Sequence, residues 1–141
     1  MEGLARGYSS HWGWVDKQMF KTSESDHSYR FEDHGPKYLQ RGPRSDIGVV
    51  TLQPGQHFPA HKHSLIEENF LTIAGEVHMY VDGDLHVLGV GDFARCDPGE
   101  THYVINKGDI AWKAVFIKAP YNPTDGTPVD WTPEDGKSIF E

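Results

Sequence analysis

Short runs of alternating apolar and polar residues, separated by turns rich in Gly, Pro and Asp, fill the middle of this chain from residue 37 to residue 118. A two-residue period bounded by such turns is typical of half-buried strands. The expected strands are 37–41, 47–53, 68–74, 77–81, 85–87, 93–96, 101–106 and 110–118. Asp82-Gly83, between two of these runs, is a strong signal for a two-residue hairpin. The pattern predicts an all-β fold, an antiparallel sandwich or barrel.

A polar segment of mixed composition, residues 1–36, precedes this core. It carries Trp12, Trp14 and Phe20 among serine, aspartate and lysine residues, and it follows neither a helical nor a strand period. We expect an N-terminal arm that docks through these aromatic side chains.

The segment that follows the core, residues 119–141, contains four prolines spaced so that neither a helix nor a central strand can persist. We expect an extended C-terminal tail that is ordered by docking on the core or on a neighbouring subunit. At 141 residues, the chain is predicted to be a single domain, residues 1–141, with its core at about 37–118.

Charge and composition argue against several classes of protein. The formal net charge of -8 disfavours non-specific nucleic-acid binding, and an anionic substrate would need a local cationic handle. No apolar run reaches 18 residues and the N-terminus lacks the apolar region of a signal peptide, so we expect a cytoplasmic protein with no membrane partner. The single cysteine, Cys96, excludes an internal disulfide and is expected to be a small buried apolar residue.

Three histidines and one glutamate are candidate metal ligands. His61 and His63 lie two residues apart on a strand-like run, so both imidazoles point to one face. Glu68 begins the next strand and offers a carboxylate oxygen, and His102 offers a third nitrogen from a distant strand. Such a donor set suits one divalent transition metal: Fe, Mn, Ni, Cu or Zn.

The spacing of these residues resembles the two motifs of the cupin superfamily. The run Gly55-x5-His61-x-His63-x4-Glu68-x6-Gly75 matches the first motif throughout, in the variant that germin-like members have. The neighbouring Glu67 would break the six-residue spacing to the glycine and would lie on the opposite face of its strand, so Glu68 is the expected ligand.

The second motif is matched with one departure. In Gly91-x5-Asp97-x-Gly99-x2-His102-x3-Asn106, an aspartate stands where the family usually has proline. This changes a turn and not a ligand. The resemblance covers about residues 47 to 118 and implies the antiparallel double-stranded β-helix of the family, the jelly-roll or cupin barrel. It also implies a metal on the four residues named above.

Both faces of the strand 68–74 are largely apolar. Phe70 and Thr72 share the face of Glu68, whereas Leu71 and Ile73 share the other. A strand of this kind needs a cover on each side. We therefore expect a homodimer formed through sheet faces, an arrangement that is also common among small cupins.

Three functions are compatible with an octahedral ion that keeps two positions open. The favoured one is oxygen-dependent dioxygenase chemistry on a small keto or enol compound. The alternative is a non-redox isomerase, lyase or decarboxylase that acts on a sugar-derived or carboxylic acid, with the ion as a Lewis acid. A non-catalytic module that binds a small molecule is the third. The ligand set alone does not separate them.

Candidates for the remaining catalytic groups are fewer. Arg95, on the strand before His102, could hold a substrate carboxylate or lie at the surface. His57 is a candidate proton carrier if an irregular turn at Pro59 brings it near the site. Tyr38 could line the cavity or pack in the core. Alternation places Tyr103 on the outward face of its strand, opposite His102.

Overall fold

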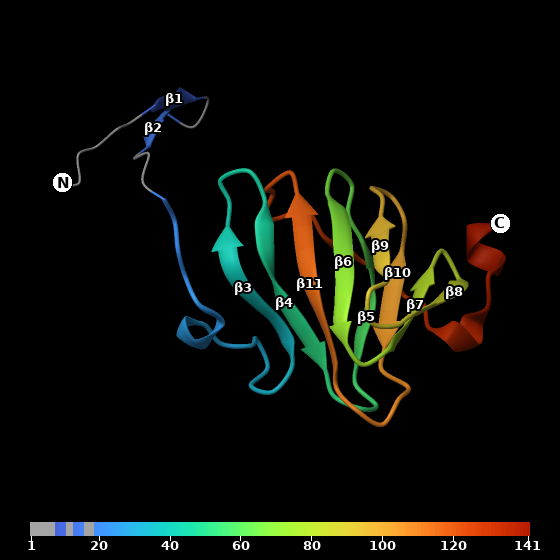
Figure 1. Cartoon of the computed structure of the whole chain (residues 1–141). Helices are drawn as coiled ribbons and strands as arrows, with labels where there is room; N and C mark the ends of the chain where they lie inside the picture. Colours follow the sequence, from blue (N-terminus) through green and yellow to red (C-terminus); the bar gives the residue numbers. More distant parts are fainter. Residues whose placement is uncertain (1–7, 11–12, 16–18) are drawn as a thin grey trace.

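The computed structural model describes residues 8–10, 13–15 and 19–141. Within them the chain forms two five-stranded antiparallel sheets, a two-stranded ladder and three short 3-10 helices, but no α-helix (Figure 1). None of the described helices is long and apolar enough to cross a membrane. The all-β prediction is confirmed.

The strands follow the turns that the sequence indicates. Their bounds are β1 (Tyr8–Ser10), β2 (Gly13–Val15), β3 (Gly35–Arg41), β4 (Asp46–Leu52), β5 (His57–Lys62), β6 (Glu67–Ala74), β7 (Val77–Val81), β8 (Asp84–Leu88), β9 (Phe93–Cys96), β10 (His102–Ile105), β11 (Trp112–Ala119) and β12 (Thr127–Pro128). The 3-10 helices are η1 (Glu24–Asp26), η2 (Pro133–Asp135) and η3 (Ser138–Phe140). Asp82 and Gly83 both have positive φ, 47° and 84°, as a two-residue hairpin turn between β7 and β8 requires.

From β4 to β7 and again from β8 to β12, successive strands alternate between the two sheets. Sheet I has the order β3-β4-β11-β6-β9, and sheet II has the order β12-β5-β10-β7-β8. The chain therefore crosses from β5 in sheet II to β6 in sheet I and back to β7 in sheet II. This is the predicted double-stranded β-helix.

The core lies between the two sheets. Its buried members are Val50, Leu52, Phe70, Val77, Met79, Leu88, Cys96, Val104, Trp112, Ala114 and Phe116. The indole of Trp112 donates to Thr72 Oγ1 at 2.9 Å, which satisfies both buried polar groups. Burial raises the pKa of Cys96 above its usual value, so this thiol is an inert core residue, as expected.

A glycine in β4 makes room for two aromatic rings on the inner face of sheet I. Gly48 lies between Tyr38 on β3 and Phe116 on β11, whose rings pack edge to face at 5.1 Å. A Cβ atom at this position would lie 2.2 Å from the Lys37 carbonyl oxygen and 2.9 Å from the Phe116 ring. The absence of a side chain at Gly48 is therefore what brings the two rings together.

The outer face of sheet I is apolar, as the alternation in β6 predicts. Phe70 and Thr72 are buried between the sheets, whereas Leu71 is 39 % and Ile73 is 45 % exposed. Phe93, which pairs with Leu71 across β6 and β9, is exposed as well. Among the described residues nothing covers these side chains.

The N-terminal arm contacts sheet I through charged groups. Glu24, in η1, accepts a hydrogen bond from Lys113 Nζ at 2.8 Å. The expected contact through Phe20 is wrong, because this side chain is 66 % exposed. Trp12 and the side chain of Trp14 lie outside the described residues.

The C-terminal tail covers the outer face of sheet II (Figure 1). Its strand β12 pairs with β5, and Val129 N donates to Ala60 O at 3.0 Å. Trp131 is buried against Ala60 and Tyr103. Tyr103 thus faces outward as predicted, yet the tail buries it. The expected ordered docking of the tail on the core is confirmed.

Candidate metal centre

A β-bulge in β5 directs side chains toward the interior of the barrel. His102 and Val104 of β10 are two residues apart, but their partners on β5, His61 and Phe58, are three apart. One extra residue on one strand reverses the alternation of side chains. Phe58 and His61 consequently both face the interior, while Ala60 between them faces the tail.

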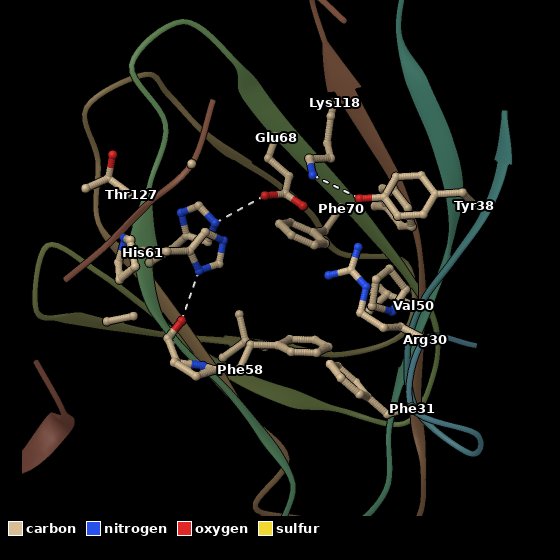
Figure 2. A pocket seen from close by; sticks show the side chains of 18 residues that line it. Arg30, Phe31, Tyr38, Val50, Phe58, His61, Glu68, Phe70, Lys118 and Thr127 are labelled. Carbon is tan, nitrogen blue, oxygen red and sulfur yellow. Dashed lines mark hydrogen bonds and ion pairs between the residues drawn. The ribbon is translucent and has the colours of Figure 1, made fainter. Parts of the chain in front are cut away.

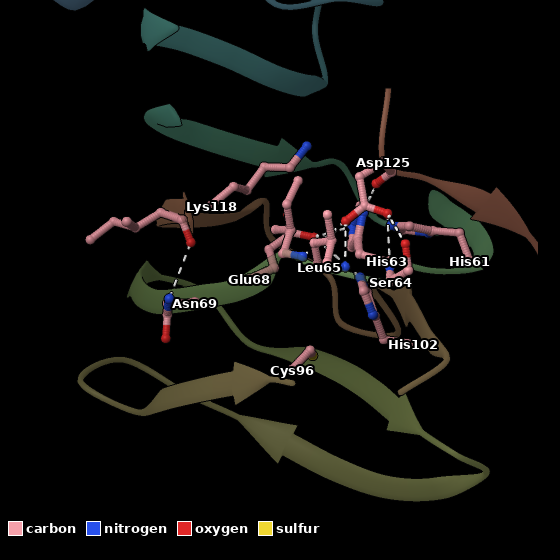
Figure 3. Close-up of polar contacts among 12 residues, drawn as sticks. His61, His63, Ser64, Leu65, Glu68, Asn69, Cys96, His102, Lys118 and Asp125 are labelled. Carbon is pink, nitrogen blue, oxygen red and sulfur yellow. Dashed lines mark hydrogen bonds and ion pairs between the residues drawn. The ribbon is translucent and has the colours of Figure 1, made fainter. Parts of the chain in front are cut away.

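Four side chains from three strands converge beside this bulge. His61 is the last residue but one of β5, His63 follows that strand directly, Glu68 lies on β6, and His102 begins β10. One candidate ligand atom from each of the four lies within 4.8 Å of the others, and Figure 3 shows them on facing strands. The structure thus brings together the four residues that the sequence motifs single out.

Glu68 lies at the centre of this cluster. Its Oε1 atom is 3.2 Å from Nε2 of His63 and 3.2 Å from Nε2 of His102. Burial by itself would raise the pKa of this carboxyl, but the contacts with the two histidines and the charge of Lys118 lower it below its usual value. The group is therefore an anion inside the barrel. Glu67, by contrast, contacts Asn69 Nδ2 at 3.1 Å.

Two of the imidazoles are oriented by backbone carbonyl groups. Nδ1 of His61 donates to Pro59 O at 2.9 Å, and Nδ1 of His63 donates to Asp125 O. A carbonyl oxygen only accepts, so Nδ1 carries a proton in both rings, and in the neutral form of each ring Nε2 has the lone pair that a metal needs. Without a metal, the hydrogen bond to Glu68 raises the pKa of His63 above its usual value. Burial, followed by the charge of His102, lowers the pKa of His61 to about 4. At neutral pH this imidazole is uncharged, which is the form that binds a metal.

The donor set fits a divalent ion. Neutral imidazole nitrogens and one carboxylate oxygen are the ligands that Fe, Mn, Ni, Cu and Zn accept. Nδ1 of His102 is buried without a hydrogen-bond partner among the described residues. A set of purely structural histidines would be hydrogen-bonded at both nitrogens, since a buried unpaired polar atom costs about 1–3 kcal/mol. The cluster is therefore able to bind a metal.

A residue of the C-terminal tail, Asp125, holds the loop between the second and third of these residues. Its carboxylate accepts from Ser64 N at 2.8 Å, Ser64 Oγ at 2.7 Å, Leu65 N at 2.7 Å and Ile66 N at 2.9 Å (Figure 3). Burial would raise the pKa of Asp125, but these hydrogen bonds lower it below its usual value. The same residue offers its backbone carbonyl to His63. Asp125 thus fixes a loop and an imidazole together.

The sequence analysis missed Asp125. It is 61 residues away from Ser64 along the chain, in a tail that contains other aspartates. No motif distinguishes it from Asp130 or Asp135. Only the docking of the tail on β5 places it beside the loop.

The three catalytic candidates have different positions. Tyr38 lines the cavity beside the cluster. His57 does not, because the bulge turns it outward, where its ring stacks on Tyr103 at 5.5 Å. Arg95 is 54 % exposed and forms an ion pair with Asp97 at 2.7 Å. The structure brings only Tyr38 to the site.

The cavity has a volume of about 410 Å³ and opens from the cluster toward β3 and β4 (Figure 2). His61, Glu68 and His102 form one end of it. Lys118 Nζ, on β11, donates to Tyr38 Oη at 3.1 Å along its wall. Phe31, Val50, Phe58, Phe70, Val104 and Phe116 line much of the remaining surface.

A comparison with protein families matches the Cupin domain over residues 48–118, about half of the chain. The chain belongs to the cupin family.

Two curated relatives have similar sequences. Mannose-1-phosphate guanylyltransferase of Escherichia coli is 25 % identical over 109 residues, which is 74 % of this chain. Gentisate 1,2 dioxygenase 1 of Aquipseudomonas alcaligenes is 33 % identical over 79 residues, or 55 % of this chain. The cupin chain spans only 23 % of the length of each.

Solved structures share the fold. A conserved protein with a double-stranded β-helix domain from Klebsiella pneumoniae has a TM-score of 0.69 at 23 % identity, covering 81 % of this chain and 100 % of that one. A sugar phosphate isomerase of the cupin superfamily from Silicibacter pomeroyi has a TM-score of 0.59 at 22 % identity, covering 69 % of this cupin and 67 % of that chain. At this identity the likeness concerns the fold alone.

Replacement of Asp125 should weaken metal binding at the cluster. In Asp125→Asn the carboxylate loses one of its acceptor oxygens, so the 64–66 loop and the orientation of His63 loosen. We expect an affinity for Zn(II) lower by roughly 10-fold, the lower end of the range for groups that orient metal ligands. Chelator competition measures it. Asp130→Asn, an exposed tail aspartate, is the matched control. Equal affinities of the two variants would contradict a role for Asp125.

Proposed function

We propose that this cupin is a metal-dependent enzyme that acts on a small keto or enol compound by oxygen-dependent dioxygenase chemistry. The observation that carries the proposal is the position of the cluster: His61, Glu68 and His102 form the end of a cavity large enough for a small metabolite. A buried ligand set that faces such a cavity suits catalysis better than a structural ion, which would be closed off by its ligands.

The ion would be held by His61, His63, Glu68 and His102. With a redox-active metal such as iron bound there, the site supplies the electron transfer through which dioxygen can react with an organic substrate and cleave a carbon–carbon bond. The protein contributes the orientation of His61 through Pro59 and of His63 through the tail, and a cavity with a largely apolar wall.

Two observations support the dioxygenase. Apart from Arg30, Tyr38 and Lys118, the cavity wall away from the cluster is largely aromatic and aliphatic and offers few groups that would hold water or protonate an intermediate. The relative that is 33 % identical over 79 residues is a gentisate 1,2 dioxygenase. Since the chain spans less than a quarter of that relative, the activity of the whole relative is carried over here only as a proposal.

A non-redox isomerase, lyase or decarboxylase is the second candidate, and the pair Tyr38 and Lys118 favours it. The ammonium group donates to the phenolic oxygen at 3.1 Å, which directs the phenolic proton away from Lys118. Both residues line the cavity that contains Glu68 and His102. A phenol and an amine in this place can hold or move a proton on a substrate while a metal polarises its carbonyl group.

Oxygen dependence separates the two functions. We expect the Fe(II)-loaded protein to consume oxygen with keto and enol acids, as recorded with an oxygen electrode, and to be inactive without oxygen. Conversion of substrate by Mn- or Zn-loaded protein under nitrogen would instead identify the non-redox enzyme. Tight binding of these compounds without turnover under either atmosphere would leave the non-catalytic binding module as the function.

The identity of the carboxylate ligand has its own test. Glu68→Gln removes the anion from the cluster and should lower metal affinity at least as far as the roughly 10–100-fold that loss of an outer partner causes. Glu67→Gln is the matched control and should retain the metal content of the unmodified protein, measured by elemental analysis after dialysis. The reverse order would show that Glu67 is the ligand.

We also propose a cytoplasmic homodimer that covers the outer face of sheet I. Exposed Leu71, Ile73, Phe93 and Ile117 gather on that face, and a contiguous apolar patch of this kind is typical of an interface.

Phe93→Lys should convert the dimer into a monomer, since it places a charge in the apolar contact. Light scattering coupled to size exclusion measures the mass. Val90→Lys, at an exposed turn, should leave the dimer intact, and a monomeric unmodified protein would refute the assembly.

A further inference from the structure

One part of the cavity, around Tyr38, is positively charged. Arg30, Arg41 and Lys118 surround the ring of Tyr38, with Cζ of Arg41 at 4.1 Å, Nζ of Lys118 at 5.6 Å and Cζ of Arg30 at 6.0 Å from its centroid. They come from three places in the chain: the arm before β3, the end of β3 and the end of β11. Figure 2 shows Arg30 directed into the cavity from the side of Tyr38.

None of these three cations forms an ion pair with a carboxylate among the described residues, although the chain has 21 acidic and only 13 basic residues. Other cations do have partners: Lys113 contacts Glu24, and Lys137 contacts Asp84. In an acidic protein, three cations gathered without an ion-pair partner around one side chain of the cavity and its adjoining hollow favour an anionic ligand.

Two other carboxylates close to this group are occupied by other partners. Asp46 and Asp125 line a polar hollow of about 430 Å³ that adjoins the cavity and contains Arg41. Asp46 Oδ1 accepts from Gly42 N at 3.1 Å, and the Asp125 carboxylate is occupied by the 64–66 loop. Neither of them forms an ion pair with Arg30 or Arg41.

The positive group lies one strand away from the metal cluster. Lys118 on β11 is the direct cross-strand partner of Glu68 on β6, and both line the cavity. Directly opposite residues on neighbouring strands have Cβ atoms about 4.5–5.5 Å apart. One small molecule can therefore span from the cations to the cluster.

The wall between these two ends is hydrophobic. Phe58, Phe70, Phe116 and Val50 offer no hydrogen-bonding groups from their side chains. A sugar acid carries a hydroxyl group on most of its carbon atoms, and each would lose its water without a partner on this wall. An aromatic or other apolar ring loses nothing there, because it gains by leaving water.

We propose that the substrate is a carboxylic acid with an apolar, ring-sized body, whose carboxylate binds among Arg30, Arg41 and Lys118 while the body lies on the phenylalanine wall. The keto or enol oxygen of the substrate then faces the end of the cavity formed by His61, Glu68 and His102. This assignment rests on the proposed function for the reacting end alone; the carboxylate and ring positions follow from the cavity itself.

Binding of three probes by the full chain tests the assignment. Titration calorimetry with the Zn(II)-loaded protein, which is redox-inert, compares benzoate with benzamide, which has the same ring without the charge, and with gluconate, which has the charge on a hydroxylated chain. We expect benzoate to bind at least roughly tenfold more tightly than either, the difference that one charge-assisted contact makes. Equal affinities, or tighter binding of gluconate, would overturn the assignment.

Variants locate the carboxylate. Arg30→Gln and Arg41→Gln, both at exposed side chains, should each lower the affinity for benzoate roughly tenfold and leave the affinity for benzamide unchanged. Arg95→Gln, an exposed arginine away from the cavity, is the matched control and should bind benzoate like the unmodified protein. Unaltered benzoate affinity in both cavity variants would refute the site.

Removal of the metal separates this assignment from the proposed function. The preference for benzoate over benzamide should persist in protein treated with EDTA, because the arginines carry it. If the preference disappears with the metal, the carboxylate binds the ion and the assignment fails while a metal-dependent enzyme stands. If the preference persists but no metal-loaded form turns over any substrate, the proposed function fails and the anion site stands.

Discussion

The β-bulge in β5 is the constraint on which the site depends. In a regular strand, Phe58 and His61 would face opposite sides of sheet II, because they are three residues apart. The extra residue lets one strand supply both part of a hydrophobic wall and a candidate metal ligand to the same interior. The carbonyl group of Pro59, within the bulge, is also the acceptor that orients the His61 ring. One local irregularity therefore sets the position of the His61 side chain, its tautomer and the apolar surface beside it.

The tail is part of the site and not an appendage to it. The bulge turns Ala60 outward, where it receives Val129 and Trp131, and this docking brings Asp125 to the loop that precedes Glu68. Because Asp125 also orients His63, an ion that binds the oriented ring binds the docked form of the tail more tightly than any undocked form. By linkage, a bound metal must then stabilise the docked tail to the same degree.

The strands and the four clustered residues could be predicted because each follows from a pattern of neighbouring residues in the sequence. Alternation placed Glu68 inside and Glu67 outside, and motif spacing paired His61 with His63. The bulge was not predictable, since it depends on how β5 pairs with β10, and it is the reason that His57 faces Tyr103 and not the cavity. Arg30 and Asp125 were not predictable either, because they belong to segments without periodicity that only tertiary packing brings to the barrel.

The charges around the cavity favour the binding of an organic anion beside a bound metal. A divalent ion on Glu68 and three neutral imidazoles would retain a net charge of about +1, and Lys118, Arg30 and Arg41 lie on the same cavity or its adjoining hollow. Like charges at such distances repel in a cavity with hydrophobic walls more strongly than in water. A bound carboxylate would relieve that repulsion, so the metal and the organic anion should each increase the affinity for the other. The same cations that make the centre unfavourable for a metal alone thus make it favourable for a metal together with its substrate.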